Sequence, residues 1–222
     1  MSRILALVLT LLLPAAVAAE ARTGVAQFSD VIEVMDSSIS VAMGNTVRVR
    51  FAVGELDIVA ADVDSVQTDL EIRCERLSEA LCTKYRERLR LEAIDRDGVV
   101  EVRLVGLPKW KLRKLQLDAK VTVPDWAPLE VQVGVGDVDI YAGDRDLAVR
   151  MGIGDLTVHI PEERVRSVQA ATRIGDASLR GALHRPGKRR MLIGAKINWA
   201  DGEGDIDIAL GLRIGDASVV LE

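Results

Sequence analysis

Four carboxylates recur in one setting along the second half of the chain, each directly after a glycine that ends an alternating apolar run. The four pairs are Gly136-Asp137, Gly154-Asp155, Gly175-Asp176 and Gly215-Asp216, and an earlier copy joins Gly54 to Glu55. Carboxylates at regular spacing suggest calcium, which takes six or more oxygen ligands. Acidic residues at tight turns, however, more often accept hydrogen bonds from nearby backbone groups. We therefore interpret these pairs as structural corners, with calcium binding as the alternative.

Residue types that carry catalysis are sparse. The two histidines, His159 and His184, lie in different repeats, and the alternation around His159 predicts that its side chain faces solvent. The sequence contains no Gly-x-Ser-x-Gly elbow, no histidine pair at metal-ligand spacing and no phosphate-binding loop. We assign no catalytic residue, no metal ligand and no cofactor. A polysaccharide-acting enzyme remains a third alternative, because β-helical folds include such enzymes and fold alone does not decide function.

Two basic segments stand out in a chain whose formal net charge is -5. The first contains Lys109, Trp110, Lys111, Arg113 and Lys114, and the second contains Arg185, Lys188, Arg189 and Arg190. Such segments suit phosphorylated lipid headgroups or anionic polysaccharide, although solvated loops of scattered charge are the simpler interpretation. The negative net charge argues against a general nucleic-acid partner.

The acidic residues lie between short strands. At each corner glycine the apolar residues change from odd to even positions, or from even to odd. Before Gly136 the apolar residues occupy odd positions from Leu129 to Val135, and after Asp137 they occupy even positions from Val138. A strand alternates faces with period two, so a one-residue shift would turn the next apolar set outward. An extra residue in a bulge or corner restores the facing, and glycine suits that place because it adopts backbone angles closed to other residues.

The corner glycines recur roughly every 20 residues. The interval from Gly175 to Gly215 is about twice the others, and Gly194 lies midway, with Ala195 in the place of the aspartate. These regular units predict an all-β fold, a short β-solenoid or β-helix-like stack of roughly 20-residue coils in which each coil covers its neighbour. A sandwich of hairpins is the rival, since spacing does not distinguish parallel from antiparallel pairing.

The N-terminus predicts export. Arg3 precedes a mainly apolar run, Pro14 interrupts it, and small residues suited to cleavage follow. The run is short for a membrane span, and no cysteine stands at the cleavage point. We therefore expect a cleaved signal peptide (residues 1–19), no transmembrane anchor afterwards, and a periplasmic or secreted protein that is not a lipoprotein. We expect a flexible mature N-terminus over residues 20–30 and one β domain over residues 31–222.

The two cysteines, Cys74 and Cys82, are expected to form a disulfide, because disulfides form and persist in exported proteins. A pair of metal ligands is the alternative, but two cysteines without a nearby histidine make a poor site. Cys82 lies in the segment 75–88, where Leu77, Leu81 and Tyr85 recur every four residues. This period predicts a short amphipathic helical insert.

The valine-rich strand that ends in proline, the turn after it and the successive Gly-Asp corners, over residues 120–222, resemble the bacterial putative-adhesin domain. Residues 37–67 share the resemblance. It implies an exported β-solenoid domain of adhesin-like character and supplies no catalytic residue. We expect from it a non-catalytic binding or scaffolding domain of the cell envelope, whose partner is envelope polysaccharide, lipid headgroups or another envelope protein. An envelope-stress accessory protein that contacts membrane components is the alternative.

Overall fold

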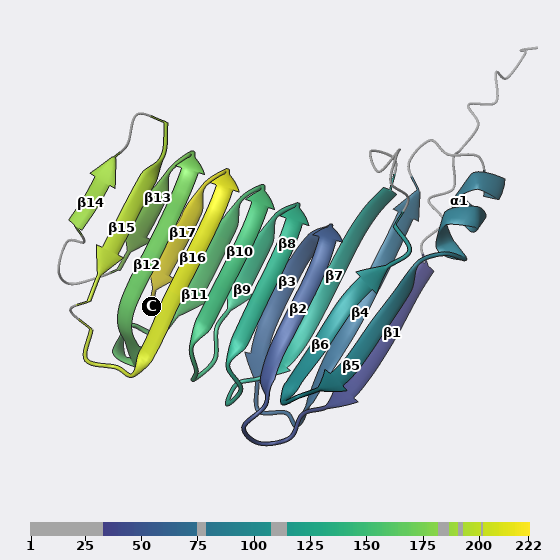
Figure 1. Cartoon of the computed structure of the whole chain (residues 1–222), viewed down its shortest axis with the longest axis horizontal. Helices are drawn as coiled ribbons and strands as arrows, with labels where there is room; N and C mark the ends of the chain where they lie inside the picture. The colour runs from purple at the N-terminus through teal and green to yellow at the C-terminus, as the bar shows by residue number, and fades with distance from the viewer. Residues whose placement is uncertain (1–32, 75–78, 108–114, 182–186, 191–192, 201) are drawn as a thin grey trace, which may run out of the picture.

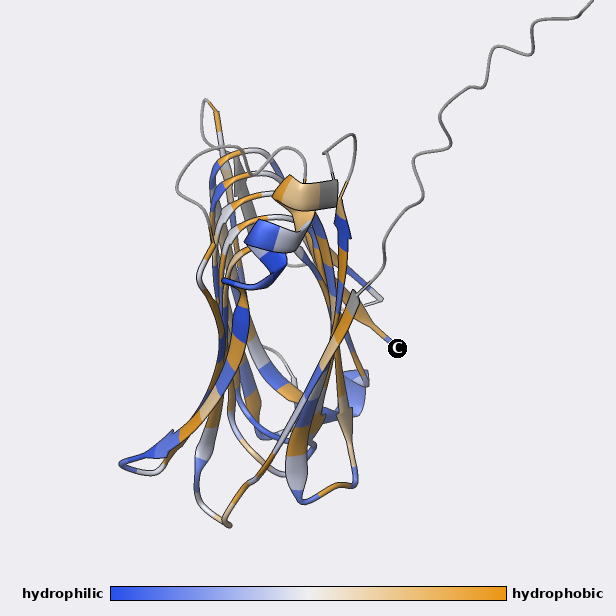
Figure 2. Ribbon diagram, turned by 90° about the vertical axis from the view of Figure 1, so that its right-hand side faces the viewer, coloured by the Kyte–Doolittle hydropathy of each residue, from blue (hydrophilic) through white to orange (hydrophobic). Residues whose placement is uncertain are grey.

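The computed structural model describes residues 33–74, 79–107, 115–181, 187–190, 193–200 and 202–222, and their strands form two sheets that face each other (Figures 1 and 2). Sheet A contains, in spatial order, β1 (Glu33–Ser40), β4 (Ser65–Cys74), β7 (Leu115–Pro124), β3 (Glu55–Ala61), β9 (Val138–Tyr141), β11 (Leu156–Ile160), β17 (Ala217–Leu221) and β13 (Ala177–Arg180). Sheet B contains β14 (Gly187–Arg190), β15 (Ala195–Trp199), β12 (Val165–Ile174), β16 (Ile206–Ile214), β10 (Leu147–Ile153), β8 (Leu129–Val135), β2 (Thr46–Val53), β6 (Val99–Val105) and β5 (Arg90–Arg96). The predicted signal peptide and flexible N-terminus, residues 1–30, lie outside the described residues.

Among the described strands, five pairs cross from sheet B to sheet A at a corner of one or two residues: β2–β3, β8–β9, β10–β11, β12–β13 and β16–β17. A glycine and an acidic residue join the two strands of each pair. Gly136 has a φ of 145°, and a Cβ there would lie 1.8 Å from the carbonyl oxygen of Gly54. Gly154 repeats this arrangement, with its missing Cβ 1.7 Å from the oxygen of Gly136. Glycine is required at these corners both for the backbone angle and for the close approach of the next corner.

The prediction of a β-solenoid stack of roughly 20-residue coils is wrong, because the chain forms two mixed sheets. Their middle strands pair in parallel, but β1, β4 and β7 pair antiparallel in sheet A, as do β5 with β6 and β15 with both β12 and β14 in sheet B. The spatial order also departs from the chain order, since β16 lies between β10 and β12, and β17 lies between β11 and β13. Apolar alternation sets which face of a strand is buried, but it is the same for either pairing direction and for any strand order.

The predicted degenerate corner at Gly194 also differs from the other corners. Gly194 directly precedes β15, whose neighbours β12 and β14 both belong to sheet B. It therefore does not join the two sheets. Its missing Cβ would lie 2.4 Å from the carbonyl oxygen of Thr172, so a close backbone approach accounts for the glycine.

One aliphatic core fills the space between the two sheets, which face each other in Figure 2. Val131 of β8, Val149 of β10 and Leu210 of β16 lie in register on sheet B. Ile140 of β9 and Val158 of β11 form a corresponding row on sheet A. All five are buried, and each fully buried side chain of this size stabilises the fold by about 1.5–3 kcal/mol.

The helix α1 (Glu79–Arg86) lies at the end of the molecule where β1 and β4 stand (Figure 1). A disulfide joins Cys74, the last residue of β4, to Cys82 in α1, which confirms the predicted pairing. Cys82 and Tyr85 are buried, so one face of the helix contacts the core. Among the described helices, none is both long and apolar enough to cross a membrane.

Candidate functional site

The acidic residues at the corners bind backbone amides of neighbouring corners. Oδ1 of Asp137 accepts from the amide of Asp155 at 2.9 Å, and Oδ1 of Asp155 accepts from the amide of Asp216 at 3.0 Å. Oδ1 of Asp216 then accepts from the amide of Asp176 at 2.7 Å. We call these four residues the aspartate ladder. In the part of the chain that the structure describes, no three histidine, cysteine, aspartate or glutamate side chains are arranged to hold a metal ion.

The predicted basic contact segment, Lys109, Trp110, Lys111, Arg113 and Lys114, lies outside the described residues, as do Arg185, His184 and the side chains of Lys188, Arg189 and Arg190. His159 lies on the outer face of sheet A, half-buried. Its Nδ1 is 3.0 Å from Oε1 of Glu222, and its ring stacks on Tyr141 with the centroids 4.7 Å apart. This contact secures the last residue of the chain to the sheet.

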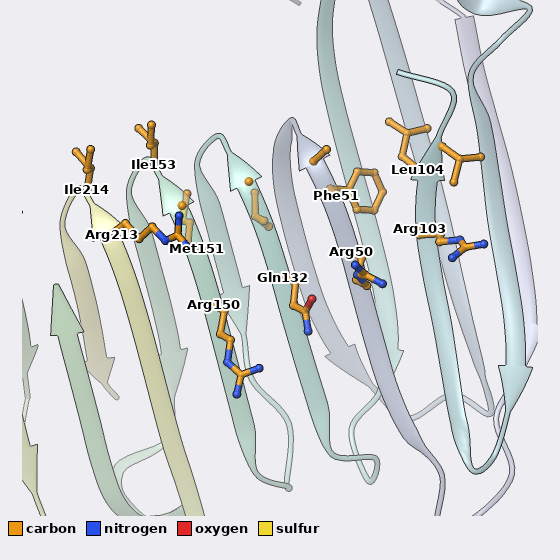
Figure 3. Close-up of a pocket in the computed structure, with 15 residues that line it drawn as sticks. Arg50, Phe51, Arg103, Leu104, Gln132, Arg150, Met151, Ile153, Arg213 and Ile214 are labelled. Atoms are coloured by element: carbon orange, nitrogen blue, oxygen red, sulfur yellow. The ribbon is translucent and has the colours of Figure 1, made fainter. Parts of the chain in front are cut away.

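The outer face of sheet B contains a hollow of about 840 Å³ that crosses β16, β10, β8, β2 and β6 (Figure 3). We call it the sheet B groove. Arg103, Arg50, Gln132 and Arg150 lie in register across four neighbouring strands and form one side of it. The alternation that buries Val49, Val131 and Val149 turns these polar residues outward.

The groove is hollow because the next outward positions carry little or no side chain. They are Ala52 on β2, Gly134 on β8 and Gly152 on β10. A Cβ on Gly134 would lie 2.3 Å from the carbonyl oxygen of Ala52, and one on Gly152 would lie 2.2 Å from that of Gly134. The strands approach each other so closely here that larger residues do not fit, and the outer surface reaches down to the backbone.

The arginines at one end of the groove are paired with acids. Arg103 donates to Glu92 from Nη2 at 2.7 Å, and this hydrogen bond raises the pKa of the guanidinium. Arg50 lies 3.5 Å from Glu101. The guanidiniums of Arg150 and Arg213, by contrast, have no hydrogen-bond or ion-pair partner among the residues that the structure describes. Positive charge is therefore available at the β10–β16 end of the groove.

A row of exposed aliphatic side chains follows the groove at the end of the strands. Val135, Ile153, Ile214 and Ile174 lie in register and are each 42–46% exposed. We call this row the apolar ladder. Ile153 and Ile214 border the groove (Figure 3). Contiguous exposed apolar residues of this kind mark interaction sites more often than single ones do.

Sequence reasoning missed the groove because it searched for runs of charge. The signal available was positional: Arg50, Gln132 and Arg150 each stand four residues before a corner glycine, and Arg213 stands two before. The residue directly before each of these glycines is Val or Ile, and the residues of the apolar ladder stand in this position. Aligning the repeats on their glycines would have placed Arg50, Gln132 and Arg150 in one row and the apolar ladder in another. Between them lies the row of Ala52, Gly134, Gly152 and Arg213.

The outer face of sheet A has the opposite character. A hollow of about 760 Å³ there is lined mainly by carboxylates, among them Asp57, Asp69, Asp118 and Asp139, with Lys120 and Arg73 between them. The two hollows therefore carry opposite charge. An anionic ligand would be repelled from sheet A and attracted to sheet B.

The sequence matches no protein-family profile and no curated protein. Among solved structures, the fold is similar to a putative cell adhesion protein from Clostridium sporogenes, with a TM-score of 0.53 and 14% identity over 86% of this chain and 100% of that chain. A putative adhesin from Parabacteroides distasonis aligns with a TM-score of 0.34 and 12% identity over 84% of this chain and 70% of that chain. The first likeness supports the resemblance to adhesins at the level of the fold, without its solenoid description.

Proposed function

We propose that this protein is an exported, non-catalytic binding module of the bacterial cell envelope and that the sheet B groove holds its ligand. The observation that carries the proposal is the pair Arg150 and Arg213, two unpaired guanidiniums beside one hollow. The hollow has a volume within the range of small-molecule sites, about 300–1,000 Å³. Guanidinium groups bind phosphate and carboxylate with paired hydrogen bonds, so the ligand is an anion of one of these two kinds.

The chemistry of the lining supports binding rather than catalysis. Among the described residues that line the groove, the polar side chains are four arginines and Gln132. The remaining lining residues are apolar or glycine. General acid–base or nucleophilic catalysis needs a carboxylate, histidine, serine, cysteine, lysine or tyrosine at the reacting atoms. The arginines instead sit on regular strands, which hold side chains in place more rigidly than loops do.

Export is part of the proposal for two reasons. Residues 1–19 have the composition of a signal peptide. The disulfide between Cys74 and Cys82 suits an oxidising compartment such as the periplasm or the cell exterior.

The test follows the arginine Nε–Hε signals of the purified chain from residue 20 by NMR while methyl phosphate or acetate is added at millimolar concentration. We expect the signals of Arg150 and Arg213 to shift, and to shift less at high salt because exposed charges are screened. Arg173 is the matched control, since it is exposed at the equivalent place on β12 but lies outside the groove. The proposal fails if neither anion shifts the two signals, or if Arg173 responds equally.

A further inference from the structure

The two sides of the sheet B groove differ in polarity. The polar side spans four strands from Arg103 to Arg150, and the apolar side consists of Ile153 and Ile214 on β10 and β16. Arg150 stands on the polar side of β10 and Ile153 on its apolar side, separated by three residues or roughly 10 Å of extended chain. The groove crosses five strands, and the four intervals between them, at about 4.8 Å each, give a length of about 19 Å. The row between the two sides is formed by Ala52, Gly134 and Gly152, and Arg213 ends this row on β16, in register with Gly152.

We infer that the ligand of this groove is a single-chain anionic amphiphile. Its phosphate or carboxylate head is held by Arg150 and Arg213 at the β10–β16 end of the groove. Its hydrocarbon chain begins between Ile153 and Ile214 and runs from there over Gly152, Gly134 and Ala52. A carbon zigzag with bonds of about 1.5 Å advances about 1.3 Å per carbon, so the groove accommodates a chain of about 14 carbons. The inference rests on the proposed function and narrows its ligand from any small anion to an amphiphile.

An anionic polysaccharide fits the lining less well. Its many hydroxyls need hydrogen-bond partners when they are buried, and Gln132 is the one neutral polar side chain among the described lining residues. Sugars also stack on exposed rings, whereas Phe51, the one aromatic residue in the same set, is 2% exposed. If a polysaccharide were the ligand, the apolar side of the groove would have no function in binding.

An extended peptide and a bilayer surface fit less well for geometric reasons. Extended peptides add to the edge of a sheet through backbone hydrogen bonds, whereas the groove lies on a face in the middle of sheet B. A flat anionic membrane that reached Ile153 would also meet Asp155, two residues further on, in the aspartate ladder. Charge repulsion there disfavours a bilayer, while a single amphiphile in the groove avoids those carboxylates.

The test measures the affinity of the chain from residue 20 for hexyl, octyl, decyl and dodecyl phosphate, each below its micelle concentration, by calorimetry. Complete burial of a methylene group would tighten binding about fourfold, and an open groove that buries about half of it gives about twofold per carbon. We therefore expect dodecyl phosphate to bind roughly 50-fold more tightly than hexyl phosphate. Dodecyl maltoside, which has the same chain and a neutral head, should bind at least about tenfold more weakly than dodecyl phosphate.

Two double variants separate the chain from the head. Ile153→Ser with Ile214→Ser should weaken every alkyl phosphate, because both side chains contact the first carbons of the chain. Ile174→Ser should leave the affinities unchanged, because Ile174 continues the apolar ladder outside the groove. Arg150→Gln with Arg213→Gln should weaken every alkyl phosphate about tenfold while keeping the dependence on chain length. All substituted side chains are exposed, so thermal unfolding should confirm that each variant remains folded.

The outcomes distinguish the two proposals. If methyl phosphate shifts the Arg150 and Arg213 signals but affinity does not rise with chain length, the amphiphile inference fails and the anion-binding function stands. If Ile174→Ser weakens alkyl phosphate binding as much as Ile153→Ser with Ile214→Ser does, the chain lies elsewhere and the inference also fails. If no alkyl phosphate binds and methyl phosphate shifts neither signal, both proposals fail.

Discussion

The backbone amide of Asp155 donates a hydrogen bond to Oδ1 of Asp137 at 2.9 Å, which ties together two adjacent corners of the fold. The carboxylate of Asp155 in turn accepts from the amide of Asp216 on the next corner. Asp155 and Asp216 therefore each act as donor through the backbone amide and as acceptor through the side chain. The aspartate ladder extends the sheet hydrogen bonding across corners where the strands themselves have ended.

Replacing Asp155 by alanine should lower the free energy of unfolding by about 0.5–1.5 kcal/mol, because the amide of Asp216 loses its acceptor. Asp155→Asn keeps an oxygen at that place and should lose less. Urea unfolding measures the free energy of unfolding of both variants. Asp139→Ala is the control, since the side chain of Asp139 is exposed and has no hydrogen-bond partner within the described residues. Equal stability of the Asp155→Ala and Asp139→Ala proteins would contradict a stabilising role of the ladder.

Gly154→Ala should destabilise the protein by more than about 3 kcal/mol or prevent folding, because it combines an unfavourable backbone angle with a severe clash. Gly154 has a φ of 131°, and the added Cβ would lie 1.7 Å from the carbonyl oxygen of Gly136. Gly211→Ala is the matched control, since the nearest atom to its Cβ would be 3.9 Å away. It should stabilise strand β16 by about 0.5–1 kcal/mol, as alanine does relative to glycine inside strands.

The yield of folded protein and its urea unfolding curve compare the two glycine variants. A Gly154→Ala protein as stable as the Gly211→Ala protein would show that the corners tolerate a side chain. The stacked glycines would then not be required by the approach of neighbouring corners.

The disulfide between Cys74 and Cys82 closes a short loop and should stabilise the protein by about 2–3 kcal/mol on the chain-entropy model. We expect Cys74→Ser with Cys82→Ser to lower the urea midpoint accordingly. Dithiothreitol should lower the midpoint of the wild type but leave that of the double variant unchanged. A reductant effect of the same size on both proteins would contradict the assignment of the effect to this bond.

The ion pair between Arg166 and Asp207 should stabilise the folded protein by an amount that depends on pH. Hydrogen bonds from Arg166 and then from Ser167 hold the pKa of Asp207 below its ordinary value of 3.8. Because the pKa is lower in the folded state, the contribution is present above the unfolded-state pKa of about 3.9. It is lost as the pH falls from there through the folded-state pKa.

Asp207→Asn should therefore be less stable than the wild type at pH 7, by about 1 kcal/mol or less since the pair is exposed. The difference should shrink as the pH falls below about 4. Urea unfolding at pH 7, 4 and 2.5 measures it, and the same substitution in an Arg166→Gln background should have a smaller effect at pH 7. A difference that stays constant across the three pH values would contradict the assignment.

Several features of the fold follow from local sequence patterns. Alternation predicts which residues of a strand face the core, because facing is a property of the extended chain itself. Val131 and Val133 before one corner and Val138 and Ile140 after it are buried, although their parity differs. The disulfide is local too, since Cys74 and Cys82 are eight residues apart, and the export predicted from residues 1–19 favours their oxidation.

The arrangement of the strands did not follow from these patterns. Predicting a solenoid assumed that consecutive units stack on each other, but β16 enters between β10 and β12. The unit at Gly194 has the spacing of a corner, yet β15 pairs antiparallel within sheet B. Backbone hydrogen bonds form between any two extended strands, so the residue types of a strand say little about its neighbours or their direction.

The candidate site depends on that arrangement. The sequence places Arg150 four residues before one corner glycine and Arg213 two residues before another, and alternation turns both outward. Only the parallel pairing of β10 with β16 brings the two guanidiniums to the same groove and sets Ile153 beside Ile214. The alternation along each strand decides which side chains point outward. Which strands lie next to each other is decided by contacts between segments that are distant in the sequence.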